Sequence, residues 1–169
     1  EVGHTLGFAH NFAASVADRA SVMDYPHPKI EIKGNQLSLA NAYDSGMGEW
    51  DNYVIAYGYQ DFAETTDSAE ALQAMVVEAR EAGLKYKSDA DARASRHGSS
   101  DGHMWDNGAN PLAEYDHLLK VREIALGNMG LNTIASGSSL SSLENALVPV
   151  YLLHRYQLEA VAKQVGGVH

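Results

Sequence analysis

Cysteine is absent from this sequence of 169 residues, and proline occurs only four times. Without cysteine the chain can form neither a disulfide framework nor a thiolate metal site. Long apolar runs are also missing, since none approaches the roughly 20 residues that a membrane-spanning helix needs. We therefore predict no membrane span in this chain.

Positive charge is scarce as well: Lys and Arg number 12 against 22 Asp and Glu, for a formal net charge of -10. The basic residues are scattered along the sequence. We expect no nucleic-acid partner, because such partners are recognised by clustered basic side chains. Hydrophobic residues make up 45% of the chain and charged residues 20%, which is typical of a folded protein. The length suits one domain or a piece of a larger one.

Two helices are predicted in the middle of the chain. GEWDNYVIAYGY, residues 48–59, has aromatic and aliphatic residues at helical spacing, and Gly58 is a plausible stop. TTDSAEALQAMVVEAREAG, residues 65–83, has N-cap candidates at 66–68 and an apolar stripe. Gly83 is its predicted C-terminal stop.

Two further helical segments follow near the C-terminus. Asn110 is a candidate N-cap with Pro111 at the first helical position. The apolar face predicted for this helix consists of Leu112, Tyr115, Leu119 and Leu126. The last segment, residues 142–167, is expected to end at Gly166. Pro149 should kink it or divide it in two, because proline removes a backbone donor and clashes with the preceding turn.

The first 36 residues have a different character. We predict a short helix followed by irregular segments and by a short strand over residues 29–37, where Ile30 and Ile32 alternate with charged residues. The predicted fold class is therefore mainly α, with a small irregular or β-containing N-terminal segment. We divide the chain into residues 1–36 and a helical region, 37–169, packed together as one domain.

The first ten residues, EVGHTLGFAH, carry the pattern E-x-x-H-x-x-G-x-x-H. In the zinc-protease signature H-E-x-x-H, two histidines one helical turn apart bind one ion, and the glutamate takes a proton from water. Glu1 and His4 fit the second and fifth positions, and the first histidine would directly precede Glu1. In the longer metzincin signature, Gly7 is the sharp turn and His10 the third ligand.

The longer signature also requires a methionine turn downstream. SVMDY supplies a candidate, with Met23 thirteen residues beyond His10. Without the histidine pattern, Met23 would be read as an ordinary core methionine. Tyr25, two residues later, lies beside a proline and has the alternative role of packing a turn. Asn11 could cap the turn after Gly7 or line the site.

These motifs, with HNFAAS, SVMDYPHP, YDSGMGEWDNYVIAYGY and YQLEAVAKQVGGVH, resemble the large bacterial zinc-dependent metalloproteases of the Met-zincin group. The likeness covers most of the chain, although its sharp motifs lie within the first 25 residues. The resemblance implies the C-terminal part of a metzincin-like catalytic domain plus a following helical region. The rest of the parent polypeptide, upstream, would supply the sheet and the upper wall of the substrate cleft.

The resemblance also implies the chemistry. The cofactor would be Zn²⁺, the substrate a peptide or protein, and the location secreted or periplasmic/cell envelope. Glu1 would be the general base, and His4 and His10 two of the three metal ligands. Met23 would lie beneath the metal as an apolar floor, and Tyr25 could reach the metal or the reacting carbonyl. With the first histidine missing, we expect the chain alone to be inactive.

Two other interpretations remain open. The chain could be a non-catalytic helical interaction or scaffold module of a larger envelope protein. It could also be a gluzincin in which Glu144 or Glu159 supplies the third ligand, but that leaves Gly7, His10 and Met23 unexplained.

An Asp-rich loop, residues 88–110, separates the second and third predicted helices. It suggests a calcium site, but it lacks the EF-hand spacing and has Arg93 where a ligand should be, so a solvated loop is favoured. The acidic candidates are Asp89, Asp91, Asp101 and Asp106. His97 and His103 could form a second metal site there. His27, His117 and His154 are expected to be loop, packing or surface residues.

Overall fold

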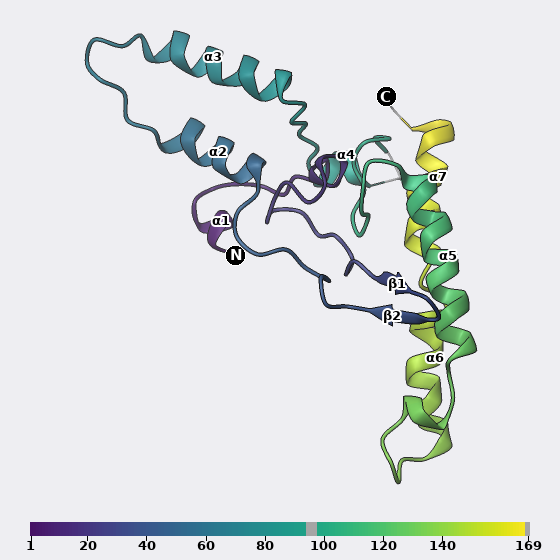
Figure 1. Cartoon of the computed structure of the whole chain (residues 1–169). Helices are drawn as coiled ribbons and strands as arrows, with labels where there is room; N and C mark the ends of the chain where they lie inside the picture. The colour runs from purple at the N-terminus through teal and green to yellow at the C-terminus, as the bar shows by residue number, and fades with distance from the viewer. Residues whose placement is uncertain (94–97, 168–169) are drawn as a thin grey trace.

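The computed structural model describes residues 1–93 and 98–167 as an elongated, mainly helical molecule (Figure 1). This confirms the predicted fold class, including the small β-containing segment near the N-terminus. The elements are α1 (Val2–Thr5), η1 (Ala14–Ala17), β1 (Glu31–Lys33), β2 (Gln36–Ser38), α2 (Glu49–Tyr59), α3 (Ser68–Glu81), α4 (Asp89–Ala92), α5 (Pro111–Gly127), η2 (Leu131–Thr133), η3 (Leu140–Ser142), α6 (Leu143–Tyr151) and α7 (Arg155–Gly166). Among the described residues, no helix combines the length and apolarity needed to cross a bilayer.

The predicted single strand over residues 29–37 is instead a hairpin. β1 and β2 are antiparallel, with Ile32 opposite Leu37. The chain reverses at Gly34, whose φ of 64° lies in the left-handed region that glycine adopts without steric cost. The strand prediction was wrong because it read through this two-residue turn. Figure 1 shows the hairpin ending against α5.

The helices α2 and α3 form an antiparallel pair that projects from one end of the molecule (Figure 1). The N-cap of α3 is Asp67, whose carboxylate accepts from the backbone N–H groups of Ala69 and Glu70 at 2.9 and 3.2 Å. Gly83, with a φ of 79°, follows the end of α3 as predicted. The predicted stop at Gly58 was wrong, since α2 continues through it to Tyr59.

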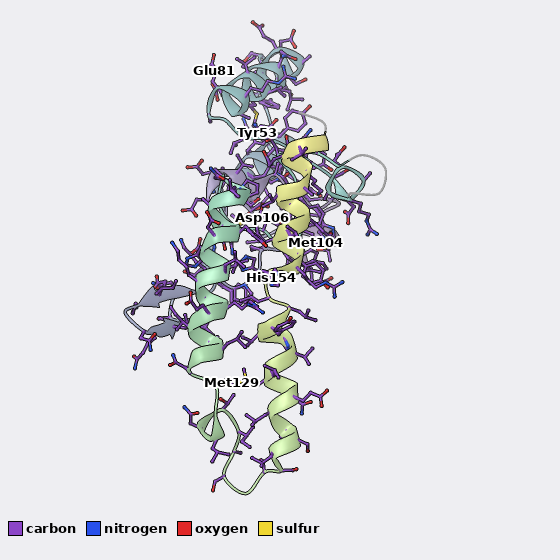
Figure 2. The ribbon with its side chains drawn as sticks, turned by 90° about the vertical axis from the view of Figure 1, so that its right-hand side faces the viewer. Tyr53, Glu81, Met104, Asp106, Met129 and His154 are labelled. Atoms are coloured by element: carbon purple, nitrogen blue, oxygen red, sulfur yellow. The ribbon has the colours of Figure 1, made fainter. Side chains whose placement is uncertain are left out.

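The C-terminal half is a column in which α6 and α7, one after the other, run antiparallel to α5 (Figures 1 and 2). Asn110 caps α5 and Pro111 is its first residue, as predicted. The predicted apolar face of α5, through Leu112, Tyr115, Leu119 and Leu126, was wrong. The buried residues are Leu118 and Val121, because α6 and α7 pack against that side.

The division expected from Pro149 is present but displaced. Pro149 lies inside α6, and the break between α6 and α7 falls at residues 152–154, a few residues later. A proline lacks the N–H that would bond to the carbonyl four residues before it, so the helix is weakened over the turn around it. The predicted end at Gly166 is confirmed.

The core around the N-terminal segment is small. Phe12 is fully buried, and Ala13, Ala14, Ala20 and Met23 are nearly so. Hydrogen bonds from buried polar residues join this segment to the helical region, as described below. The division at residue 36 remains a prediction.

Candidate metal centre

The two histidines of the opening motif are brought together by a sharp turn at the end of α1. Gly7 has a φ of 86°. The N–H of Phe8 donates to the carbonyl of Gly3, and the N–H of Gly7 donates to the carbonyl of His4, both at 3.0 Å. This bond pattern is the Schellman motif, which favours glycine at the left-handed position. The turn reverses the chain and returns His10 to the side of His4.

The imidazoles of His4 and His10 face each other through their Nε2 atoms, which lie 3.1 Å apart. Each Nδ1 has its own acceptor. The Nδ1 of His4 lies 2.9 Å from the carbonyl of Phe8, and the Nδ1 of His10 lies 2.9 Å from a carboxylate oxygen of Asp89. Since these acceptors carry no proton to give, each Nδ1 must be the donor.

This geometry fits a metal ion. A neutral imidazole with its proton on Nδ1 carries a lone pair on Nε2, so two lone pairs point at each other here. A cation between them would satisfy both. Two nitrogens bound to one tetrahedral zinc at about 2.0–2.1 Å would lie roughly 3.3 Å apart, close to the separation in this structure. The donor set therefore suits zinc.

Met23 lies directly against α1. It is buried, and a Cβ at Gly3 would overlap its sulfur, so the absence of a side chain at Gly3 lets Met23 approach the helix that carries His4. The N–H of Asn11 donates to the carbonyl of Met23 at 3.0 Å. The structure thus places Met23 beside both histidine segments, and its role as a methionine turn stays a prediction.

Tyr25 contacts the ring of His10. Its ring centroid lies 4.8 Å from that of His10, and Phe12 is 5.4 Å from the same imidazole. Tyr25 also lines a pocket of about 770 Å³ whose wall includes Trp105 and Met47. Tyr25 therefore lies between the ring of His10 and this pocket.

Glu1 is the N-cap residue of α1, and its side chain is exposed. The carboxylate makes no hydrogen bond to the N–H groups at the start of α1, so Glu1 does not cap the helix with its side chain. Residues three apart on a helix lie on one face, which brings Glu1 and His4 to the same side of α1.

The comparisons with known proteins decide the family. The model of the Met-zincin family matches residues 1–169. The chain belongs to the Met-zincin family. No curated protein and no solved structure gives a significant match. Membership in the Met-zincin family implies a zinc metallopeptidase.

Three ligands are not present together in the part of this Met-zincin chain that the structure describes. Within residues 1–93 and 98–167, no group of three or more His, Cys, Asp or Glu side chains could hold a metal ion. Neither Glu144 on α6 nor Glu159 on α7 forms such a group with His4 and His10. The gluzincin interpretation needs only His4 and one glutamate from this chain, so it stays a prediction that this finding does not test.

The sequence did not identify Asp89 as a support of the site, and for Asn11 it offered only capping of the turn after Gly7 or lining of the site. Asn11 is fully buried, and its Nδ2 donates to the carbonyl of Lys85 at 2.9 Å. Its Oδ1 accepts from the backbone N–H groups of Ala13 and Lys87, each at 3.1 Å. Asn11 therefore fastens the segment after His10 to residues 85–87, which lead into α4 and Asp89.

Asp51 was also missed. This buried residue of α2 accepts from the hydroxyl of Ser21 at 2.7 Å and from the N–H groups of Val22 and Gly48 at 2.9 and 2.7 Å. The methionine turn is thereby bonded to the start of α2. Glycine followed three residues later by aspartate, at a helix start, is a weak local signal for such a contact.

Two buried carboxyl groups have raised pKa values. Burial raises the pKa of Asp24 to about 7, although backbone bonds from Tyr25 and Ser15 oppose the rise. Burial likewise raises the pKa of Asp106 to about 6. Asp106 and His154 lie between α5 and the α6–α7 pair (Figure 2).

The acidic residues of loop 88–110 are dispersed, so they form no calcium site among the described residues. Asp89 contacts His10, Asp91 caps Ser88, Asp101 pairs with Lys85 at 2.6 Å, and Asp106 accepts from the N–H of Asn107. The expectation of a solvated loop was wrong for much of it, because Ser99, Ser100, His103, Asp106 and Asn107 are buried. Burial requires polar partners for these side chains.

The other histidines have structural partners. The ring of His27 lies 3.2 Å from Glu114, and His117 donates to the carbonyl of Ile30 at 2.7 Å. His103 donates to the carbonyl of Tyr156, and burial lowers its pKa to about 4, helped by the positive charge of Lys163. His154 packs edge-on against Tyr115. His97, the other half of the suggested second metal site, lies outside the described residues.

Proposed function

We propose that this chain carries part of the active site of a zinc-dependent endopeptidase and forms the C-terminal portion of its catalytic domain. The observation that supports this proposal is the pair of Nε2 atoms 3.1 Å apart, with each Nδ1 already donating to an acceptor. The match to the Met-zincin family supports the same conclusion.

The third protein ligand is proposed to be a histidine directly before Glu1 in the parent polypeptide. Such a residue would lie four positions before His4, on the same face of a helix continued by α1. We propose that the 169-residue chain alone, with two imidazoles, binds zinc weakly and does not hydrolyse peptides. The parent polypeptide is proposed to be bacterial and to act in the periplasm or cell envelope, or outside the cell.

Zinc bound at this site would polarise the scissile carbonyl and lower the pKa of the attacking water. Glu1 accepts the proton from that water and delivers it to the leaving amine nitrogen. His4 and His10 would hold the metal through their Nε2 atoms. Tyr25, beside His10 and exposed to the pocket, donates its hydroxyl proton in a hydrogen bond to the carbonyl oxygen as it gains negative charge. The pocket lined by Tyr25 and Trp105 holds a side chain of the peptide.

The test uses the parent polypeptide, extended upstream of Glu1. We expect one zinc per chain and zinc-dependent hydrolysis of casein. Glu1→Gln should keep the zinc and lower hydrolysis by about 10²–10⁴-fold, the usual contribution of a general base. His10→Ala should lose the zinc. Glu78→Gln, at an exposed position of α3, is the matched control and should change neither property.

The scaffold interpretation makes the opposite prediction. If the extended protein binds no zinc and cleaves no protein substrate, the proposal is wrong and a non-catalytic helical module is favoured. Full zinc-dependent activity in Glu1→Gln would remove Glu1 from the mechanism. Any residue before Glu1 that cannot bind a metal would contradict the proposed ligand set.

A further inference from the structure

Asp89 reaches His10 from a distant part of the chain. Its carboxylate oxygen accepts from the Nδ1 of His10 at 2.9 Å, across 79 positions of sequence. The side chain of His10 is 21% exposed and that of Asp89 is 44% exposed. Ion pairs this open to solvent usually contribute little to stability. The contact therefore calls for an explanation other than folding energy.

The backbone around Asp89 is held in place on both sides. Before it, the N–H of Phe12 donates to the carbonyl of Lys87 at 2.8 Å, and Asn11 bonds to the backbone of both Lys85 and Lys87. After it, Asp91 accepts from the N–H and the hydroxyl of Ser88 at 2.9 and 3.0 Å, which closes the short helix α4. Asp89 lies between these two anchors, opposite the ring of His10.

The two histidines differ in what holds them. The Nδ1 of His4 donates to the carbonyl of Phe8, which the Gly7 turn places within the same motif. His10 follows that turn, and its Nδ1 donates to a side chain brought from α4. His4 is thus oriented by its own segment, whereas the orientation of His10 depends on Asp89.

We propose that Asp89 is a positioning residue for the metal site: it fixes the proton of His10 on Nδ1 and aims its Nε2 at the same point as the Nε2 of His4. This inference rests on the proposed function. A carboxylate that accepts from the outer nitrogen of a ligating histidine fixes its tautomer and makes it a stronger ligand. Asp89 does not touch the metal or the substrate, so its effect passes through His10.

The experiment compares zinc affinity in variants of the parent polypeptide by competition with a chromophoric chelator. Asp89→Ala should weaken zinc binding by about 10–100-fold, the usual effect of removing such a partner. Asp89→Asn should weaken it less, because the amide oxygen can still accept from Nδ1 but carries no charge. Asp101→Asn is the matched control: it removes the same charge from the same loop, where Asp101 pairs with Lys85, and should leave the affinity unchanged.

A second readout needs no metal. In the metal-free protein, the ¹⁵N resonances of His10 should report the tautomer with the proton on Nδ1, and Asp89→Ala should shift the population toward the other tautomer. His4 is the internal control, because its partner is the carbonyl of Phe8 and should be unaffected. Circular dichroism confirms that the variants fold. A purely structural role for Asp89 would not change the tautomer of one histidine alone.

The outcomes separate the two proposals. Wild-type zinc affinity in Asp89→Ala, or an equal loss in Asp101→Asn, would overturn the positioning role. If the wild-type protein binds no zinc at all, the proposed function fails, and the tautomer measurement still decides on Asp89. A His10 with its proton on Nε2 and none on Nδ1, in the wild-type metal-free protein, would overturn the positioning role, and an Nδ1 proton that depends on Asp89 would support it.

Discussion

Removal of the Asp51 carboxylate should detach the methionine turn from α2. Asp51 is only 3% exposed and accepts three hydrogen bonds of 2.7 to 2.9 Å, from Ser21, Val22 and Gly48. Two of these donors are backbone N–H groups, of Val22 before α2 and of Gly48 at its start. In Asp51→Ala, both N–H groups and the buried hydroxyl of Ser21 would lose their acceptor.

The size of the effect follows from these bonds. A hydrogen bond to a charged group contributes about 1.5–3 kcal/mol, and an orphaned buried donor costs about 1–3 kcal/mol. Since the bonds share one acceptor group, they do not add in full, and the loss should be about 3–5 kcal/mol. Native proteins have unfolding free energies of about 5–15 kcal/mol, so this single change would remove a large fraction of the stability.

The measurement is urea unfolding of the wild-type chain and of Asp51→Ala, followed by circular dichroism. Asp51→Asn keeps the shape but presents an amide N–H₂ to donors, and should lie between the two. Asp116→Asn, at an exposed position of α5, is the control and should lie within about 0.5 kcal/mol of wild type. A loss below about 1 kcal/mol in Asp51→Ala would refute the role given to these bonds.

Three further changes have expected outcomes. Gly48→Ala should destabilise the chain by more than about 2 kcal/mol in thermal unfolding, because the added Cβ would overlap the backbone of Ala20. In the control Gly127→Ala the Cβ meets open space, so this change should be neutral or stabilising, and equal effects of the two substitutions would contradict the prediction. Because burial raises the pKa of Asp24 from 3.8 to about 7, the native state retains a proton that the unfolded chain releases. The unfolding free energy should therefore fall as the pH rises through this range, and Asp24→Asn should flatten the curve; a curve parallel to that of wild type would be evidence against it. Lys163→Met should cost about 2–4 kcal/mol in urea unfolding, since the buried ammonium donates to two backbone carbonyls, and an unchanged midpoint would exclude that role.

Features set by neighbouring residues could be predicted from the sequence. The caps at Asp67 and Asn110 and the ends at Gly83 and Gly166 depend on side chains or φ angles within one turn of the helix. The buried side of α5 could not be predicted in this way. Its sequence offers apolar residues on more than one face, and only the position of α6 and α7 selects Leu118 and Val121.

The candidate site likewise contains one part that neighbouring residues predict and one part that depends on distant residues. His4, Gly7 and His10 lie within seven consecutive positions, and the geometry that joins them is a helix followed by one left-handed turn. Asp89 lies 79 positions from His10, and nothing in its own neighbourhood marks it as a partner of a histidine. The pattern Ser88-x-x-Asp91 could have predicted the start of α4, but not what α4 faces.

The helical region, whose purpose the sequence left open, supports this part of the site through one continuous set of contacts. Lys163 of α7 donates from its buried ammonium to the carbonyls of Ala92, the last residue of α4, and of Gly102. Burial lowers the pKa of Lys163, because desolvation disfavours the charged ammonium group. The two hydrogen bonds to backbone carbonyls offset part of this cost. The short helix α4 could not hold its position alone, because a single turn has little intrinsic stability. By fixing the end of α4, α7 holds Asp89 opposite His10, and the C-terminal column thereby acts on the orientation of one proposed metal ligand.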